Sequence, residues 1–454
     1  MIQKIHLIAI GGSVMHNLAL ALHHGGHIVS GSDDQIYEPA KSRLSKAGIM
    51  PPEEGWFPEK INAELDLVIL GMHAKDDNPE LKKALQLGLK VSSFPEFVFS
   101  QFNEKQRLVV AGSHGKTTTT SMLMHVLKKL SKKFDYLVGA QLEGFNEMVS
   151  FTDADLALIE GDEYLSSCMD KSPKFLHYKP QIAIITGIAW DHYNVFPTYD
   201  LYKKAFSDFI LSMPTGGNLI YFEKDPELVT LIGQFGTHLN CIPYKEAPYV
   251  QQDQETYLIG QSACYKLNVF GKHNLQNIQS IRLACNLLGI SELDCNEAIS
   301  DFKGASRRME LLEETEDKFV FQDFAHAPSK VKATLEAIRE KFKTRKVLAI
   351  QELHTYSSLN KAFIPQYLGT MNPVDNGIIF FDKKALEIKR MPELEEDFIR
   401  QSFGRSDLLV INESDILKEQ ILKIAKSAEV VLFLGSGNFG GLNIRSLAKE
   451  IVNS

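Results

Sequence analysis

The sequence predicts an α/β protein of three domains, each with a mainly parallel sheet at its centre. Short apolar runs that suit buried strands alternate with amphipathic stretches that suit helices, and this alternation indicates parallel strands joined by crossover helices. The chain has 454 residues, which is more than one hydrophobic core usually supports. We therefore expect domains at residues 1–104, 105–303 and 304–454.

The first domain is predicted to begin with a strand at residues 4–10 and a helix at Val14–His24. Further apolar runs that suit strands lie at residues 27–33, 65–72 and 90–94. Each run is short and is followed by polar or glycine-containing sequence, as expected for strands of a parallel sheet.

A glycine-containing turn follows the first predicted strand. It reads Gly11-Gly12-Ser13, and Ser32-Asp33 close the second strand about 20 residues later. The arrangement suits a nucleotide in a Rossmann-like crevice, with its diphosphate on the turn and an acid near the end of the second strand. The pattern G-x-G-x-x-G is absent, so a purely structural turn is an equally good interpretation.

The most specific local motif lies between an apolar strand at residues 107–111 and a long amphipathic helix. It reads Gly112-Ser113-His114-Gly115-Lys116-Thr117-Thr118. In such a loop, glycines let backbone N–H groups approach a phosphate, lysine neutralises charge and threonine holds Mg²⁺. The general phosphate-loop pattern has glycine where this chain has Val110. The alternative is an ordinary glycine-rich turn with an exposed lysine.

A candidate metal site follows two later strands of the central domain. Glu160 opens the sequence EGDEY after one strand, and Asp191-His192 follow the next strand, at residues 182–188. Neighbouring parallel strands bring their carboxyl ends together, so a carboxylate and an imidazole can share a cation beside the phosphate loop. The alternative is that the acids are solvated and the histidine is hydrogen-bonded within the core.

Three further clusters combine residue types that suit chemistry. Residues 271–277 (GKHNLQN) open a helix, where asparagines either contact an adenine or cap the helix. Arg307-Arg308 lie at a predicted domain junction and suit a phosphoryl group. Residues 323–328 (DFAHAP) end a strand of the third domain, which we expect to continue with a helix at residues 329–342. Its other strands are expected at residues 346–353, 377–382 and 429–437.

Composition and charge exclude several classes of protein. Hydrophobic residues make up 44% and charged residues 23%, as in ordinary globular proteins. The net charge of −8 disfavours nucleic-acid binding, which needs clustered Lys and Arg. The five cysteines form no C-x-x-C pair, so we expect reduced thiols. No apolar run is long enough for a membrane span or a signal peptide, and we expect a cytoplasmic protein without a membrane partner.

Taken together and in this order, these motifs resemble the Mur ligase family, which builds the peptide of bacterial peptidoglycan. The resemblance covers essentially the whole chain. It implies a three-domain Mur ligase architecture with a Rossmann-like N-terminal domain that binds a UDP-sugar. A central domain of the P-loop ATPase type binds ATP, and a Rossmann-like C-terminal domain binds an amino acid or peptide. It also implies Mg²⁺, with Mn²⁺ as a substitute, and small-molecule substrates bound by a monomer or weak homodimer.

The resemblance assigns roles to residues at the matching positions. The implied catalytic residues are Lys116, Glu160, His192 and Arg308. The implied metal ligands are Thr117, Glu160 and His192. The implied ATP-binding residues are Gly112, Ser113, His114, Gly115, Lys116, Thr117, Thr118, His273, Asn274, Asn277, Arg308, Asp323 and His326. The implied UDP-sugar-binding residues are Gly11, Gly12, Ser13, Ser32, Asp33 and His73. The implied peptide-binding residues are His354, Thr355, Ser357, Gly437 and Asn438.

The N-terminal stretch resembles the branch of the family whose acceptor is UDP-N-acetylmuramate. Its implied reaction is the ATP-dependent formation of an amide through an acyl phosphate on the lactyl carboxylate. We expect the amine to come from the tripeptide L-Ala-γ-D-Glu-meso-diaminopimelate, in peptidoglycan recycling. Three segments resemble that subgroup, namely residues 166–180, 352–358 and 435–442. L-alanine, in peptidoglycan biosynthesis, is the alternative amine.

Two positions depart from the family pattern. Gly187 stands where the family usually has an asparagine, and Ala327 stands where a second histidine is commoner. A catalytically silent nucleotide-binding scaffold is the hypothesis that these two residues favour. A third hypothesis is an oxidoreductase built on the N-terminal Rossmann-like unit, and the incomplete glycine pattern speaks against it.

Overall fold

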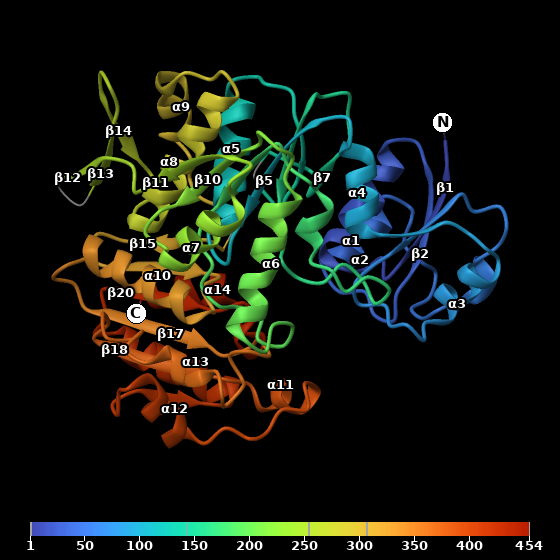
Figure 1. Ribbon diagram of the computed structural model, residues 1–454. Coiled ribbons are helices and arrows are strands. Elements are labelled where there is room, and N and C mark those ends of the chain that lie inside the picture. The colour runs from blue at the N-terminus through green and yellow to red at the C-terminus, as the bar shows by residue number, and fades with distance from the viewer. Residues whose placement is uncertain (1, 143, 253–254, 306, 454) are drawn as a thin grey trace. The chain divides into compact units, whose positions relative to one another are not determined.

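The computed structural model describes residues 2–142, 144–252, 255–305 and 307–453 (Figure 1). The chain forms two compact units, and each is described by itself. The first unit contains the chain up to residue 112 together with residues 119–188 and 203–244. The second unit contains residues 113–118, 189–202 and 245–454. The phosphate loop and the Asp191-His192 loop therefore group with the C-terminal part of the chain. The domain limits at residues 104 and 303 stay predictions.

The first sheet has the order β2-β1-β3-β4, and its strands are parallel. Its strands are β1 (Lys4–Ile8), β2 (Ile28–Ser32), β3 (Leu67–Leu70) and β4 (Val91–Ser93). The helices of this region are α1 (Ser13–His24), α2 (Ala40–Lys46), α3 (Pro79–Gln86) and α4 (Phe94–Phe102), with a 3₁₀ turn η1 (Pro58–Lys60). All the strands expected here are confirmed, and the helix expected at Val14–His24 begins one residue earlier. Because β1 lies between β2 and β3, the segments that follow these three strands leave the same edge of the sheet.

The central sheet has the order β11-β10-β9-β5-β8-β6-β7, and only its edge strand β7 runs antiparallel. Its strands are β5 (Gln106–Ala111), β6 (Asp135–Leu137), β7 (Val149–Ser150), β8 (Leu156–Glu160), β9 (Ile182–Ile185), β10 (Asn218–Phe222) and β11 (Asn240–Tyr244). The helices that connect them are α5 (Lys116–Lys129), α6 (Tyr199–Ser212) and α7 (Pro226–Phe235), with a 3₁₀ turn η2 (Lys174–His177). Strand β5 lies between β8 and β9, so the carboxyl ends of these three strands are neighbours.

A three-stranded antiparallel sheet of β12 (Tyr249–Gln252), β13 (Glu255–Ile259) and β14 (Cys264–Leu267) was not expected. Its side chains are largely exposed, so it lacks the apolar runs that mark the other strands. Two helices follow it, α8 (Lys272–Leu287) and α9 (Glu292–Ile299).

The third sheet has the order β15-β16-β20-β17-β18-β19, with β15 antiparallel at one edge. Its strands are β15 (Glu310–Glu314), β16 (Phe319–Asp323), β17 (Val347–Glu352), β18 (Asn376–Phe380), β19 (Leu409–Ile411) and β20 (Val430–Leu434). The helices are α10 (Pro328–Lys341), α11 (Lys383–Ile388), α12 (Glu396–Phe403), α13 (Ser414–Ala425) and α14 (Ile444–Val452), with 3₁₀ turns η3 (Ile364–Tyr367) and η4 (Phe439–Gly441).

Both faces of this third sheet are covered, as the orange and red part of Figure 1 shows. Side chains of α10 and α12 belong to one hydrophobic core, which includes Leu335 and Phe403. Side chains of α13 and α14 belong to a second core, which includes Leu417 and Leu447. Burial on both faces explains why β17 and β20 are continuous apolar runs rather than alternating ones. These strands were predictable for that reason.

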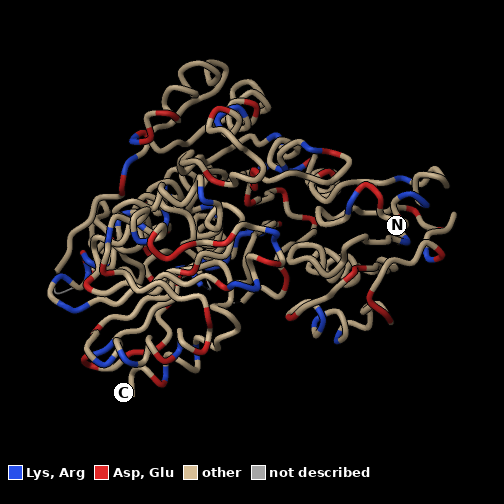
Figure 2. Tube along the Cα trace, turned by 90° about the horizontal axis from the view of Figure 1, so that it is seen from below, with Lys and Arg blue, Asp and Glu red and all other residues tan. Residues whose placement is uncertain are grey.

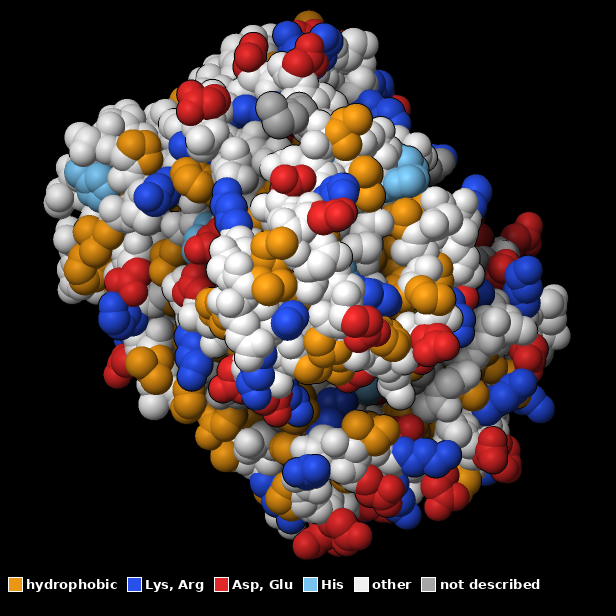
Figure 3. Space-filling model, turned by 90° about the vertical axis from the view of Figure 1, so that its right-hand side faces the viewer, with side chains coloured by type: hydrophobic (Ala, Val, Ile, Leu, Met, Phe, Trp, Pro, Cys, Tyr) orange, Lys and Arg blue, Asp and Glu red, His pale blue; other side chains and the backbone are white. Residues whose placement is uncertain are grey.

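Charged residues of both signs are interspersed along the chain trace (Figure 2). The face drawn in Figure 3 shows the same mixture, with hydrophobic side chains scattered among them. In the part of the chain that the structure describes, no helix combines the length and the apolar character needed to cross a membrane.

Candidate functional site

The phosphate loop joins the end of β5 to the start of α5. Gly112 has φ +127°, and a Cβ atom there would lie 2.2 Å from the Thr186 hydroxyl oxygen. Gly115 has φ +78°, and a Cβ atom there would lie 2.8 Å from the Asn277 side-chain oxygen. Backbone conformation favours glycine at both positions, and at Gly112 the backbone atoms of Thr186 and Gly187 also leave no room for a side chain. Lys116 and Thr117 then open α5, where helical N–H groups suit an anion.

Helix α8 approaches the phosphate loop in the second unit. Its N-cap residue Gly271 has φ +85°, and a Cβ atom there would lie 2.5 Å from the Cβ of Ala337 in α10. The Asn274 side chain donates a hydrogen bond of 2.8 Å to the Phe270 carbonyl oxygen. This contact is not a helix cap, because the N-cap residue is Gly271, which has no side chain to accept from the first N–H groups of α8. Asn277 is the asparagine that lies against the phosphate loop.

A hollow lies beside these elements, within the second unit. Its lining includes Thr118 from the first turn of α5, Phe270 and Asn274 from the start of α8, and Arg308. Lys303 and Gly304 complete the lining toward the third domain, together with Asn268, Val269 and Met309. The hollow is therefore bordered by three of the sequence motifs.

The two arginines at the predicted domain junction serve different loops. Arg308 Nη2 lies 3.4 Å from the Thr117 hydroxyl oxygen, and its guanidinium stacks 4.5 Å above the Phe324 ring. Arg307 turns away and donates a 2.8 Å hydrogen bond to the Gly437 carbonyl oxygen. Arg308 therefore brings positive charge to the phosphate loop, whereas Arg307 supports the glycine-rich segment after β20.

Asp191 and Lys330 form a buried ion pair that sequence reasoning missed. Lys330 Nζ lies 2.8 Å from Asp191 Oδ2, and the Asp191 side chain is 5% exposed. Burial alone would raise the pKa of the Asp191 carboxyl, but the charge of Lys330, with His192 and His326, holds that pKa well below its usual value. Lys330 belongs to a helical pattern with several lysines, so no local signal distinguished it from a surface residue.

Three partly buried histidines lie in this region as neutral groups. Burial and the nearby charge of Lys330 together lower the pKa of His114 to about 4 and that of His326 to about 3. Burial also lowers the pKa of His273. At neutral pH these imidazoles provide hydrogen bonds rather than charge. The His326 Nδ1 atom lies 2.9 Å from the Phe324 carbonyl oxygen, so this nitrogen carries the proton.

Asp323 ends β16 and is part of the structural support of α10. Its Oδ2 atom accepts a 2.8 Å hydrogen bond from the Thr334 hydroxyl group. The backbone N–H of Gly435 donates to its carbonyl oxygen at 3.1 Å. Asp323 is also close enough to His273 to act on the pKa of that imidazole. The residue thus connects the DFAHAP motif, the glycine-rich segment and the start of α8.

Glu160 lies in the first unit, as the last residue of β8. Its Oε2 atom accepts a 2.6 Å hydrogen bond from the backbone N–H of Gly139. Its register partner is Val110 of β5, two residues before the phosphate loop begins. The neighbouring Asp162 forms a 2.7 Å ion pair with Lys174.

The departure at Gly187 has a local structural explanation. Gly187 has φ +137°, a conformation that strongly favours glycine. The following residue, Ile188, donates its backbone N–H to Asp225 Oδ2 at 2.7 Å. Asp225 also caps α7, so a carboxylate from another helix fixes this loop. The second departure, Ala327, is the N-cap residue of α10 and is buried.

The residues expected to bind a UDP-sugar lie at one edge of the first sheet. Gly11 donates its backbone N–H to Asp33 Oδ2 at 2.7 Å, which joins the turn after β1 to the end of β2. Burial raises the pKa of Asp33 to about 6. Ser13 opens α1, Ser32 is buried at the end of β2, and His73 is exposed in the turn after β3.

The expected peptide-binding residues follow neighbouring strands of the third sheet. His354, Thr355 and Ser357 follow β17, whereas Gly437 and Asn438 follow β20, with which β17 pairs. Ser357 accepts a 3.1 Å hydrogen bond from the backbone N–H of Tyr193.

Glu352, which the sequence reasoning did not single out, joins the two segments. Its Oε1 atom accepts a 2.8 Å hydrogen bond from the backbone N–H of Phe439. Burial raises the pKa of Glu352 to about 7. A Cβ atom at Gly437 would lie 2.5 Å from Glu352 Oε2, so glycine there is a packing requirement of the carboxylate. In the sequence, Glu352 is an acid at the end of a predicted strand and Gly437 belongs to a glycine-rich stretch. Their contact could not be predicted from the sequence alone.

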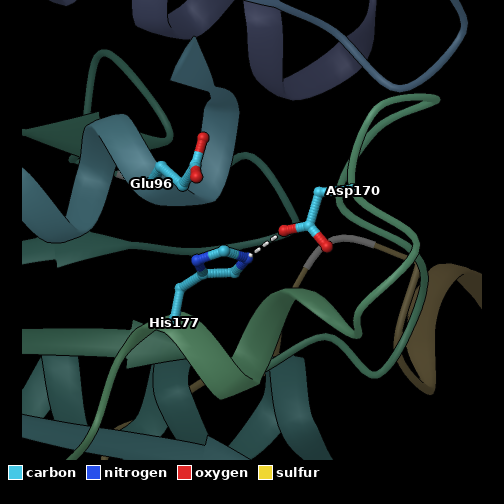
Figure 4. A group of neighbouring side chains, drawn as sticks. All are labelled: Glu96, Asp170 and His177. Atoms are coloured by element: carbon cyan, nitrogen blue, oxygen red, sulfur yellow. Dashed lines mark ion pairs between the residues drawn. The ribbon is translucent and has the colours of Figure 1, made fainter.

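A second cluster of potential metal ligands lies in the first unit, at Glu96, Asp170 and His177 (Figure 4). His177 Nε2 is 2.9 Å from Asp170 Oδ2 and 3.1 Å from the Ser166 hydroxyl oxygen. Glu96 belongs to the capping box of α4 and accepts hydrogen bonds from Ser93. Hydrogen bonds and an ion pair with neighbouring residues therefore explain these side chains as structural contacts that hold the segment at residues 166–180. We assign no ligand to this cluster.

Three family models match consecutive parts of the chain. They describe the Mur ligase family catalytic domain at residues 4–105, the Mur ligase middle domain at 110–284 and the Mur ligase glutamate ligase domain at 307–437. A UDP-N-acetylmuramate–L-alanine ligase of Clostridium botulinum is 30% identical, over 96% of this chain and 95% of that protein. The UDP-N-acetylmuramate–L-alanyl-gamma-D-glutamyl-meso-2,6-diaminoheptandioate ligase of Escherichia coli is 28% identical, over 98% of each chain.

Solved structures share the fold. The crystal structure of a murein peptide ligase from Psychrobacter arcticus matches with a TM-score of 0.70 and 24% identity, over 100% of this chain and 99% of that one. The phosphate loop, the arrangement of the sheets and these matches define an ATP-dependent ligase that forms carbon–nitrogen bonds. The chain belongs to the Mur ligase family and has its three-domain fold.

We predict that Gly112→Ala weakens nucleotide binding, because a methyl group would displace the Thr186 hydroxyl or the loop backbone. The loss of affinity for ADP should be at least about tenfold, the equivalent of about 1.4 kcal/mol, by isothermal titration calorimetry. Gly26→Ala is the matched control, since it has φ +85° with no atom within 4 Å of the added Cβ. Equal ADP affinity in the wild type and Gly112→Ala would contradict the packing argument.

We also predict that Glu352 makes stability depend on pH. Its pKa rises from 4.5 to about 7 on folding, so the folded chain holds a proton that the unfolded chain releases. Its contribution is therefore fully present below pH 4.5 and is lost as the pH rises through 7. The loss amounts to about 3 kcal/mol.

The measurement is the unfolding midpoint of the wild type and of Glu352→Gln between pH 5 and 8. The wild type should lose stability relative to the variant across this range. The exposed Glu450→Gln serves as the control. Parallel pH profiles of the wild type and Glu352→Gln would show that Glu352 keeps an ordinary pKa.

Proposed function

We propose that this ligase joins the lactyl carboxylate of UDP-N-acetylmuramate to the amine of L-Ala-γ-D-Glu-meso-diaminopimelate, with ATP as the energy source. The observation that carries the proposal is the gathering of Asn277 and Arg308 on the phosphate loop within one compact unit. A nucleotide triphosphate on that loop would meet backbone N–H groups, Lys116 and Arg308 together. L-alanine is the alternative amine.

The reaction has two steps. The lactyl carboxylate attacks the γ-phosphorus of ATP, the bond to the β-phosphate oxygen breaks and ADP leaves. The amine nitrogen then attacks the acyl carbon, phosphate leaves, and the nitrogen loses a proton as the amide forms. Phosphoryl transfer depends mainly on positioning and on charge neutralisation. Lys116 and Arg308 supply that charge, whereas the imidazoles of His114 and His326 are neutral at neutral pH and supply none.

A divalent cation would be held by Thr117, Glu160 and His192. A hydroxyl, a carboxylate and an imidazole are a donor set that suits Mg²⁺ or Mn²⁺, and when bound the ion neutralises charge on the phosphate oxygens. What supports this set is the strand order, because β5 lies between β8 and β9. The segments with the three residues follow these neighbouring strand ends. His326 and Asp323 would contribute from the third domain, and His273 and Asn274 from the start of α8.

The UDP-sugar would bind along the carboxyl edge of the first sheet. The diphosphate suits the Gly11-Gly12-Ser13 turn at the start of α1, where backbone N–H groups favour an anion. Asp33 holds this turn through Gly11, and Ser32 and His73 follow the neighbouring strands.

The choice of amine rests on the third domain. Two segments, after β17 and β20, are joined by the hydrogen bond from the Phe439 N–H to Glu352, and both carry polar residues that suit the polar groups of a peptide. His354, Thr355, Ser357, Gly437 and Asn438 would contact the peptide. Relatives with each activity are similarly close, at 28% and 30% identity, so a direct assay has to decide.

The assay compares amines on the purified protein with UDP-N-acetylmuramate, ATP and Mg²⁺. We expect phosphate release with the tripeptide to exceed that with L-alanine by at least about tenfold in kcat/KM, a difference of about 1.4 kcal/mol. The product should be identified by mass spectrometry. Preference for L-alanine would establish the alternative, and acceptor-independent ATP hydrolysis with neither amine joined would reject both.

Lys116→Ala should abolish ligation while leaving the fold intact, because the side chain neutralises developing charge and is not part of a hydrophobic core. We expect a loss of at least about a hundredfold in kcat, or about 2.7 kcal/mol in the barrier. Circular dichroism and the unfolding midpoint should match the wild type. The exposed Lys133→Ala, at 82% side-chain exposure, is the matched control. Phosphate release at near wild-type rate in Lys116→Ala would remove Lys116 from the mechanism.

A further inference from the structure

The Asp191–Lys330 pair joins two segments that lie far apart in sequence. Asp191 lies in the segment after β9, and Lys330 lies in the first turn of α10. The pair is short, at 2.8 Å, and both side chains are largely buried, with exposures of 5% for Asp191 and 19% for Lys330. Because a buried charge without its partner is strongly unfavourable, the two side chains are expected to stay together and so to hold their two segments in one arrangement.

The second oxygen of Asp191 holds the next residue. Asp191 Oδ1 accepts a 2.8 Å hydrogen bond from the backbone N–H of His192. His192 has φ +55°, a left-handed conformation that is uncommon for residues other than glycine, and the hydrogen bond to Asp191 stabilises it. A continuous chain of contacts therefore runs from the Lys330 ammonium through the Asp191 carboxylate to the backbone of His192.

Further contacts from the third domain hold the same segment. The Ser357 hydroxyl oxygen accepts from the Tyr193 backbone N–H at 3.1 Å. The Tyr193 ring lies 6.1 Å from the Phe363 ring, centre to centre. The segment is thus fixed by residues from α10 and from the stretch after β17.

We propose that Lys330 is a positioning residue, which fixes the His192 imidazole for the metal–nucleotide complex by way of Asp191. The inference rests on the proposed binding of nucleotide and metal at this site, and it is independent of which amine is joined. Helix α10, through Lys330, would therefore help to orient His192, a proposed metal ligand of the central domain. Lys330 itself does not touch the phosphates in this scheme.

The alternative is that Lys330 leaves Asp191 and binds a phosphate directly. The two roles differ in their coupling. If Lys330 acts through Asp191, the effects of Lys330→Gln and Asp191→Asn on binding are not additive, because either change breaks the same chain of contacts. If Lys330 binds phosphate, the two effects add.

The test measures binding of Mn²⁺ to the protein in the presence of ADP, by electron paramagnetic resonance of the free ion. We expect Lys330→Gln, Asp191→Asn and the double variant each to weaken Mn²⁺ binding by about 10- to 100-fold, as loss of partners of metal ligands does. Lys330→Arg keeps the positive charge and should restore part of the affinity. Lys332→Ala is the matched control, since it lies on the same helix with 64% of its side chain exposed.

Unchanged Mn²⁺ affinity in Lys330→Gln would overturn the proposal, and so would additive losses in the double variant. Lys330→Gln keeps most of the volume of lysine, and its unfolding midpoint shows whether the fold is retained. Should it unfold, Lys330→Arg and Asp191→Asn carry the test, and equal Mn²⁺ affinity in Asp191→Asn and the wild type would then contradict it. A wild-type protein that binds Mn²⁺ and ADP but joins neither amine would contradict the proposed function alone.

Discussion

The rest of the site depends on the absence of side chains at Gly112 and Gly115. Gly112 packs against Thr186 at the end of β9, and Gly115 packs against Asn277 of α8. Their backbone conformations and their close neighbours leave the loop with backbone N–H groups where side chains would otherwise stand. The roles proposed for Lys116, Thr117 and Arg308 depend on this loop being fixed between β5 and α5. The proposed nucleotide site of this chain thus rests on a steric requirement.

Two cations, Lys116 and Arg308, lie at the phosphate loop of the second unit, and several nearby groups are neutral or paired. Burial keeps His114, His326 and His273 neutral. Asp191 and Lys330 neutralise each other. Arg307 and Glu352 act on the pKa of one another farther along the third sheet. A polyanionic substrate on the loop would therefore meet the positive charge of Lys116 and Arg308.

Much of the fold was predictable because parallel strands buried on both faces are continuous apolar runs, as in β5, β9, β17 and β20. The phosphate loop was predictable because its glycines and lysine stand at fixed spacing. The sheet β12-β13-β14 was not, because its exposed strands carry no such runs. Lys330 and Glu352 were missed for another reason. Lys330 pairs with Asp191, which lies more than a hundred residues away, and Glu352 accepts a hydrogen bond from Phe439 in the loop after β20. A single sequence gives no indication of such distant contacts.

We have proposed that Lys116, Glu160 and His192 act on one metal-bound triphosphate. Anomalous scattering of Mn²⁺ in crystals grown with a non-hydrolysable ATP analogue tests this arrangement. We expect a manganese peak within coordination distance, about 2.0–2.3 Å, of Thr117, Glu160 and His192, with the triphosphate on residues 112–118. A peak at Glu96, Asp170 and His177 instead, or a triphosphate bound away from Lys116, would contradict it.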